Sequence, residues 1–333
     1  MIAFALLAAL AVAAPRPGEL KTIRDWTVGC DNGRACQAVA LLPEDGADGA
    51  TLAVRRGAEA GAVPELWLTI RSESGAAPAF LAVDGRRVAL APAGDGDSFR
   101  VRDAGAAFLL GQATRIELLD RAGNVVAPVS TRGSAGALLY MDEQQRRLGT
   151  TGALVRRGPA SRVPPPPALP VITSPAPTAN PPRTLGPARV RQLLGRETTT
   201  CEYANELDIE SARLDARHSL LLASHPCGNG AYNLFSSAWI VDEAGHPRPA
   251  AFDASGGMGE GDDMLVNAGW DAKARRLTTF SKGRGLGDCG VGQAYVWDGT
   301  RFRLVHQEAM GECRGSTDYI TTWRAKVRRP SRR

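Results

Sequence analysis

Several common catalytic signatures are missing from this chain of 333 residues, and each absence excludes a class of enzyme. The sequence has no Gly-x-Ser-x-Gly, no His-Glu-x-x-His and no Gly-x-x-x-x-Gly-Lys-Ser/Thr, which are typical of α/β hydrolases, zinc peptidases and P-loop proteins. There is no Cys-x-x-Cys and the four histidines are scattered, so a zinc site is not expected. We therefore predict no cofactor, and enzymatic activity is the less favoured interpretation.

Long apolar runs are also missing, except at the start of the chain. Residues 2–14 form an unbroken apolar run that includes Ala11-Val12-Ala13 near its end. The run is shorter than the roughly 20 apolar residues that span a bilayer, and small residues at its end are typical of a signal-peptidase site. We therefore predict a signal peptide at residues 1–14, atypical because no Lys or Arg precedes the run. The mature protein is expected in the periplasm or secreted, without spanning a membrane; a buried N-terminal helix is the alternative.

Acidic residues are missing from residues 146–196 and 324–333, which carry nine and six basic residues. The net charge of +5 is therefore misleading, because residues 1–145 have 14 basic and 17 acidic side chains, and residues 197–323 have 11 and 18. A nucleic-acid-binding face needs Lys and Arg clustered on a folded domain, so we expect no nucleic acid as a partner. The two basic segments predict at most a loose attraction to an anionic envelope surface.

A proline-rich segment divides the chain. Residues 156–187 contain eleven prolines and no aromatic residue. Such a segment cannot bury enough apolar area to fold, so we expect an extended, semi-rigid spacer. The predicted organisation is a signal peptide (1–14), a first domain (20–150), a proline-rich basic linker (151–187), a second domain (188–324) and a basic tail (325–333).

Short apolar runs separated by turn signals predict a mainly β protein. In the first domain, Asp84-Gly85 and Gly123-Asn124 stand where hairpin turns belong, and many short strands at this spacing favour a β-sandwich-like fold. One helix is expected near residues 133–148. In the second domain, Pro187 begins a short leading helix, and two similar hairpins follow as a β-meander.

Six cysteines follow the expected signal peptide: Cys30, Cys36, Cys201, Cys227, Cys289 and Cys313. An even number in an exported chain indicates disulfides formed in an oxidising compartment. The sequence alone does not fix the pairing, but position along the chain narrows it. Cys30–Cys36, Cys201–Cys227 and Cys289–Cys313 are the simplest set, because each bond then stays within one predicted domain.

The strongest candidate for a binding site is the glycine-rich loop Lys282–Gly290, KGRGLGDCG. Its glycines allow backbone N–H groups to form a concave anion-binding nest, and Lys282 and Arg284 add positive charge. A Cys289–Cys313 bond would bring Arg314 to the same corner. The alternative is a disulfide-anchored turn in which Asp288 neutralises Arg284 or Arg314. The predicted ligand-binding residues are Lys282, Arg284, Gly285, Gly287, Asp288 and Arg314.

An acidic, glycine-rich segment at residues 253–264 offers weak calcium ligands. Carboxylates on a flexible loop suit Ca²⁺, but their spacing matches no calcium motif, so an acidic loop without metal is favoured. The candidate ligands are Asp253, Glu260, Asp262 and Asp263.

Two groups of residues resemble known families of exported bacterial proteins. Asp25–Val39 is similar to the opening of the invasion-associated locus B family. Four blocks resemble the signatures of the proteobacterial family known as domain of unknown function 1176: Cys227–Asn233, Lys282–Gly290, Val296–Leu304 and Cys313–Gly315. The resemblance implies an exported protein of the Gram-negative envelope with no established activity, so it supplies no catalytic residues.

Our leading interpretation is a non-catalytic exported protein that binds an acidic ligand, or an acidic group of an envelope partner, through the loop Lys282–Gly290. The first alternative is a hydrolase acting on an envelope polymer, with Asp288 and Glu260 as acid and base. Glycoside chemistry of that kind needs two carboxyls roughly 5–10 Å apart in a cleft. The second alternative is an electrostatic surface adaptor that works through the linker and tail.

Overall fold

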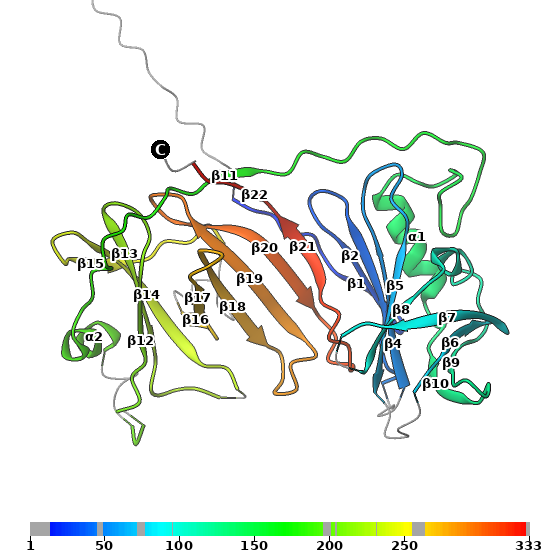
Figure 1. The fold of residues 1–333 in the computed structure, drawn as a ribbon, viewed down its shortest axis with the longest axis horizontal. Coiled ribbons are helices and arrows are strands. Elements are labelled where there is room, and N and C mark those ends of the chain that lie inside the picture. The colour runs from blue at the N-terminus through cyan, green and yellow to red at the C-terminus, as the bar shows by residue number, and fades with distance from the viewer. Residues whose placement is uncertain are drawn as a thin grey trace, which may run out of the picture.

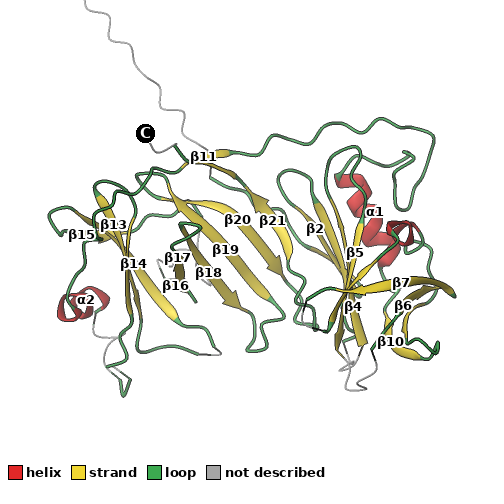
Figure 2. Ribbon diagram, viewed as in Figure 1, coloured by secondary structure: helices red, strands yellow, loops and turns green. Residues whose placement is uncertain are grey.

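The computed structural model describes residues 14–44, 49–71, 77–94, 96–195, 201–203, 205–230, 232–254 and 264–330. Within these ranges the protein is mainly β, as predicted, and Figure 2 shows its few helices among many strands. The expected signal peptide lies outside the described residues, apart from Ala14.

The N-terminal half is one curled antiparallel sheet of ten strands (Figure 1). The strands are β1 (Lys21–Ile23), β2 (Trp26–Cys30), β3 (Cys36–Ala40), β4 (Gly49–Arg56), β5 (Glu65–Arg71), β6 (Phe80–Val83), β7 (Arg86–Pro92), β8 (Ser98–Val101), β9 (Ile116–Leu119) and β10 (Val125–Val129). Their order across the sheet is β1-β2-β3-β4-β5-β8-β7-β6-β9-β10. A single curled sheet therefore stands where we expected a β-sandwich-like domain.

The predicted hairpin turn between β6 and β7 is confirmed. Asp84 and Gly85 both have positive φ, 47° and 86°, and the flanking strands pair antiparallel. A two-residue turn with positive φ at both positions matches the twist of the strands it connects. The second predicted turn, at Gly123-Asn124, joins β9 and β10, where the Asp120 amide donates to the Asn124 carbonyl at 3.0 Å.

Helix α1 (Ser134–Gln144) confirms the helix expected near residues 133–148. Its apolar side chains belong to the core of the curled sheet, where Leu138 and Met141 are fully buried together with Trp26. A short 3-10 helix, Ala104–Phe108, adds two more buried alanines to the same core. The helix packs on β1, β2 and β3.

Two five-stranded antiparallel sheets form most of the C-terminal half. The first contains β12 (Ile209–Arg213), β13 (His218–Ser224), β14 (Phe235–Asp242), β15 (Pro247–Pro249) and β16 (Leu265–Val266). The second contains β17 (Gly269–Asp271), β18 (Arg276–Lys282), β19 (Gly290–Trp297), β20 (Phe302–Met310) and β21 (Ile320–Arg324), in chain order. Leu220, Tyr295 and Phe302 lie in the shared core between the sheets.

Helix α2 (Pro187–Leu194) is the short leading helix that the sequence predicted. Pro187 lies at its start, where the missing backbone N–H has no intrahelical partner to lose. Val190 is fully buried against Trp239 and Val241, on the outer face of the first sheet. The helix therefore covers the side of β13 and β14 that the second sheet leaves open.

The linker and the tail are joined by a short parallel ladder. Strand β11 (Val171–Thr173) lies in the proline-rich segment and pairs with β22 (Lys326–Arg328) in the basic tail. Ile172 is buried against Val296 and Val305, on the outer face of the β17–β21 sheet. Sequence patterns did not predict this pairing, which holds part of the linker against the C-terminal half.

The two halves pack directly against each other. Val39, Leu41 and Ala53 of the curled sheet share a buried cluster with Met310 and Ile320. In Figure 1, β21 accordingly runs beside β2.

Three ion pairs cross the same junction. Arg314 pairs with Asp25 at 2.8 Å, Arg55 pairs with Asp318 at 2.6 Å, and Arg324 pairs with the fully buried carboxylate of Asp31. The linker therefore connects two halves that already share a core.

Candidate functional site

The three predicted disulfides are confirmed. Cys30 bonds Cys36, Cys201 bonds Cys227, and Cys289 bonds Cys313. No free cysteine occurs among the residues that the structure describes. A thiolate nucleophile is therefore not available from these six positions.

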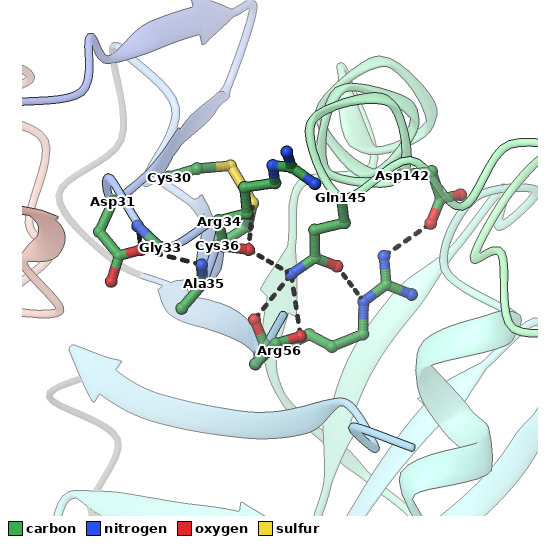
Figure 3. Close-up of a disulfide and its surroundings, with 10 residues drawn as sticks. Cys30, Asp31, Gly33, Arg34, Ala35, Cys36, Arg56, Asp142 and Gln145 are labelled. Atoms are coloured by element: carbon green, nitrogen blue, oxygen red, sulfur yellow. Dashed lines mark hydrogen bonds and ion pairs between the residues drawn. A yellow bond between two sulfur atoms is a disulfide. The ribbon is translucent and has the colours of Figure 1, made fainter. Parts of the chain in front are cut away.

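The first disulfide closes the β2–β3 hairpin, and the groups around it are hydrogen-bonded to one another (Figure 3). Asp31 accepts hydrogen bonds from the amides of Gly33 and Ala35, and Gln145 of the segment after α1 donates to the Arg34 carbonyl. Arg56 lies between Gln145 and Asp142, and its guanidinium donates to Asp142 at 2.7 Å. Since these groups satisfy one another inside the protein, the hairpin is a structural element.

A cavity of about 280 Å³ lies beside this hairpin and is lined by charged side chains of the junction between the halves. Its wall includes Arg55 and Arg324, but these pair with Asp318 and Asp31 across the junction of the halves. Arg56 and Glu65, which also line it, pair with Asp142 and Arg100, so every charged side chain of the cavity wall has a partner among the described residues.

The glycine-rich loop Lys282–Gly290 connects β18 and β19 as a tight hairpin. The Gly283 amide donates to the Cys289 carbonyl at 2.9 Å, and the Gly287 amide donates to the Arg284 carbonyl at 3.0 Å. A Cβ atom at Gly290 would lie 2.0 Å from the Ser281 carbonyl oxygen, so only glycine fits there. The glycines thus allow the loop to close tightly around its disulfide.

Asp288 occupies the centre of this loop as an internal anion. Its side chain is 3% exposed and accepts from Arg284 Nε at 2.7 Å and from the Gly315 amide at 2.7 Å. The hydrogen bond from Arg284 lowers the Asp288 pKa further than burial raises it. The carboxylate is therefore ionised at neutral pH and fills the place that an external anion would take.

Arg314 does not point towards the loop. The disulfide brings the neighbouring Gly315 amide to Asp288, but the Arg314 guanidinium donates to the Leu42 carbonyl and to Asp25 Oδ1, both at 2.8 Å. Of the predicted ligand-binding residues, Lys282, Arg284, Gly285, Gly287 and Asp288 lie together, whereas the side chain of Arg314 binds the N-terminal half.

A second loop segment, residues 232–234, is bonded to the glycine-rich loop. The Asn233 side chain accepts from the Lys282 amide and donates to the Lys282 carbonyl, each at 3.0 Å. Asn267 then donates to both Asn233 and the Phe280 carbonyl. Two sequence blocks about fifty residues apart therefore form one rigid surface.

This surface exposes large apolar side chains. The exposed fractions of Tyr232, Leu234 and Leu286 are 76%, 52% and 77%. The loops touch here, because a Cβ atom at Gly285 would lie 3.1 Å from the Tyr232 ring. Lys282 Nζ lies 5.7 Å from the centre of the same ring. We call the surface made by these side chains and Gly285 the aromatic corner.

Tyr232 adopts an unusual backbone conformation. Its φ is +60°, in the left-handed region that a bulky residue rarely enters. A conformation of this kind costs roughly 1–3 kcal/mol and persists only where the surroundings impose it. The hydrogen bonds of Asn233 supply that constraint, so the fold holds an aromatic ring in solvent against its local preference. Sequence reasoning missed Tyr232, Leu234 and Leu286, because exposure leaves no pattern in the sequence.

Of the four candidate calcium ligands, the structure describes only Asp253. Asp253 pairs with Arg303 at 2.6 Å and accepts from the Leu304 amide at 2.7 Å. Glu260, Asp262 and Asp263 lie outside the described residues. Within the part of the chain that the structure does describe, no group of three or more His, Cys, Asp or Glu side chains is arranged to hold a metal ion.

Of the acid–base pair proposed for a hydrolase, the structure describes only Asp288. Glu260 lies outside the described residues, and Asp288 is an ionised carboxylate bound to Arg284. A general acid must carry a proton at working pH, which the lowered Asp288 pKa opposes.

No helix in the described part of the chain is long and apolar enough to cross a membrane.

Comparison with known proteins gives one family and one curated relative. A family model described as "Protein of unknown function (DUF1176)" matches residues 20–326. The chain is 32% identical to "Uncharacterized protein YpfG" of Escherichia coli (strain K12) over 358 residues, which covers 96% of each chain. No solved structure matches the chain. The expected similarity of Asp25–Val39 to the invasion-associated locus B family is not shown by these comparisons.

Proposed function

The chain belongs to the DUF1176 family, whose description gives no activity, and we propose from its structure that it is a non-catalytic binding protein of an oxidising compartment. The aromatic corner is its contact surface. It binds a partner that presents an acidic group beside apolar side chains. The observation that carries this proposal is the pair Tyr232 and Leu286, each about three quarters exposed at the junction of two bonded loops.

Exposure of this size supports a contact role. Single exposed apolar residues are normal, but clustered ones mark surfaces that partners cover. Covering one such side chain contributes roughly 1.5–3 kcal/mol, and Tyr is among the residues enriched where binding energy concentrates. Covering Tyr232 and Leu286 together would therefore favour association with a partner.

The charge at the corner supports an acidic partner. Lys282 has no carboxylate within ion-pair distance among the residues that the structure describes, whereas Arg284 is already paired with Asp288. The free cation is thus Lys282, next to an aromatic ring. Of the two ligands that the sequence allowed, an acidic ligand or an acidic group of a partner, this arrangement favours the second. One lysine and two apolar side chains suit an acidic group on a partner better than a small polyanion.

Rigidity supports binding without a large entropy loss. The Cys289–Cys313 bond, the Asp288–Arg284 pair and the Asn233 hydrogen bonds fix both loops before any partner arrives. Preorganised loops lose less conformational freedom on binding. The three disulfides also support an oxidising location, which we propose to be the periplasm or the cell exterior.

Site-specific photo-crosslinking tests the proposal in the exported full-length protein. A photoreactive aromatic amino acid replaces Leu286, and the matched control replaces Val125, which is 56% exposed on β10 of the other half. We expect a discrete adduct from position 286 only, lost when Lys282→Glu is added. Equal adducts from both positions, or an adduct that survives the charge reversal, would contradict the proposal. Leu286 and Val125 are exposed, and Lys282 is half-buried with no ion pair among the described residues, so none of the changes should alter the melting temperature by more than a degree or two.

The electrostatic adaptor remains a separate prediction. Its attraction to an anionic surface would depend on the linker and tail and would fall steeply with salt. An adduct at the aromatic corner that persists at high salt therefore distinguishes the two functions.

A further inference from the structure

A cavity of about 400 Å³ lies between the linker and the β17–β21 sheet. Pro170 and β11 line it from the linker, and Pro15 lines it from the start of the described chain. Leu304 and Trp323 contribute from β20 and β21. Its size is in the range of small-molecule sites, which are mostly apolar with a few placed polar groups.

The parallel ladder of linker and tail holds the cavity closed on one side. The Lys326 amide donates to the Pro170 carbonyl at 2.8 Å, and the Ser174 amide donates to the Arg328 carbonyl at 3.0 Å. Ile172 is buried beneath this ladder. The wall is therefore part of the fold, and the cavity does not depend on a loose segment.

Three charged side chains form the polar end of the cavity. Arg303 Nε donates to Asp253 Oδ2 at 2.6 Å, and Arg303 Nη1 donates to Asp298 Oδ2 at 3.3 Å. The carboxylates of Asp253 and Asp298 are 7% and 17% exposed. Within the described ranges no other cation lies at ion-pair distance from either carboxylate, so one guanidinium faces two carboxylates inside the cavity.

Asp298 has the acceptor capacity that this excess charge requires. Its Oδ1 is occupied by the amides of Thr300 and Arg301, but its Oδ2 has only the long contact with Arg303. Burial raises the Asp298 pKa, yet the hydrogen bonds from these amides lower it more, so the group is ionised at neutral pH. A donor arriving in the cavity therefore finds a charged oxygen that is not saturated.

We propose that this cavity binds an ammonium group carried on a short aliphatic chain. The ammonium balances the uncompensated charge and donates to Asp298 Oδ2, since ammonium groups are donors only. Trp323 faces the apolar carbons, and an aromatic ring also attracts a nearby cation. An anion would be repelled by the carboxylates, and a neutral sugar would leave the charge unbalanced. The exposed rim carries Arg328, which donates to Thr173 and is screened by solvent.

The ammonium has two sources with the same chemistry. One is a free alkylamine from solution. The other is the α-amino group of the protein itself, because cleavage after Ala14 would make Pro15, a cavity-lining residue, the first residue of the chain. The second source depends on the predicted signal peptide, and the first does not.

Thermal denaturation of the exported full-length protein with n-butylamine and 1,4-diaminobutane tests the proposal, with intact mass fixing the first residue. Asp298→Asn keeps the shape of the side chain and removes its charge. Asp120→Asn is the matched control, since Asp120 also accepts a turn amide, from Asn124 of the β9–β10 hairpin. For a free amine we expect a saturable rise in melting temperature and a change in tryptophan fluorescence. Asp298→Asn should weaken the affinity about tenfold or more, as expected for losing one charge-assisted hydrogen bond, while Asp120→Asn leaves it unchanged.

The two sources give different results. If the protein's own α-amino group occupies the cavity, amines cause no shift, and Asp298→Asn lowers the α-amino pKa measured by NMR, because the variant loses the carboxylate that stabilises the charged form. The proposal is wrong if amines change neither the melting temperature nor the fluorescence and the α-amino pKa is the same in wild type and Asp298→Asn.

Discussion

Replacing Ile320 by alanine tests whether the two halves of the molecule unfold as one body. Ile320 begins β21, is fully buried, and shares a cluster with Val39 and Leu41 of the curled sheet. The contact is close, because a Cβ atom at Gly29 of β2 would lie 3.1 Å from Ile320 Cγ2. Removing the side chain therefore leaves a cavity at the junction itself.

The expected loss is large enough to measure by region. A buried Ile→Ala change lowers the free energy of unfolding by about 2–5 kcal/mol. If unfolding of the halves is coupled, amide exchange in the most protected strands should speed up by a factor of about 30 to several thousand, since each 1.4 kcal/mol is tenfold. Val125→Ala on exposed β10 is the control and should change the free energy of unfolding by less than about 0.5 kcal/mol.

Hydrogen exchange measured by mass spectrometry separates the two possibilities. In one body, Ile320→Ala accelerates exchange in β2–β5 of the N-terminal half as well as in β13 and β14 of the C-terminal half. If β2–β5 keep their wild-type rates while β13 and β14 accelerate, the halves unfold independently and our description of the junction is wrong.

Two further changes test the charges and the disulfide. Burial raises the Asp25 pKa, but hydrogen bonds from Ser130 and Arg314 bring it below its ordinary value. This carboxylate therefore stabilises the fold above roughly pH 4, and its contribution is lost as the pH falls. Asp25→Asn should lower the free energy of unfolding by about 3–5 kcal/mol at pH 7 and flatten the acid side of a plot of stability against pH. Asp318→Asn is the matched control with the opposite sign, because burial raises the Asp318 pKa. This carboxyl favours the fold below roughly pH 4 and loses that contribution as the pH rises. Asp318→Asn should therefore lower the free energy of unfolding at pH 7 by less than Asp25→Asn does. The double change Cys289→Ser and Cys313→Ser should lower stability by about 2–4 kcal/mol in urea denaturation, and an unchanged urea midpoint would mean that this bond does not constrain the unfolded chain.

The aromatic corner shows why a loop read from sequence gives only half of a site. The glycines and basic residues of Lys282–Gly290 drew attention to the right place, because glycine-rich loops and charge are local features. The residues that complete the corner, Tyr232 and Leu234, come from a block about fifty residues earlier. Hydrogen bonds between Asn233 and Lys282, and from Asn267 to Asn233 and the Phe280 carbonyl, bring the two blocks together.

The charges illustrate the same limit. Arg284 and Arg314 look alike in the sequence, since both are basic residues close to a cysteine of the same predicted disulfide. In the structure Arg284 is held by Asp288, four residues away, while Arg314 reaches Asp25 of the opposite half. The first pairing was among the alternatives the sequence offered, and the second was not, since no local pattern connects positions that far apart.

The sequence by itself indicated the strand-rich class, the positions of helices α1 and α2, and the simplest set of disulfide partners, which the structure then confirmed. These depend on side-chain periodicity, turn residues and short separations along the chain, which act before distant segments meet. Only the tertiary structure decided that the halves share a core, that the linker pairs with the tail, and that Tyr232 and Leu286 face solvent. Burial and charge pairing are set by whichever neighbours the completed fold brings near, and a one-dimensional pattern does not contain those neighbours.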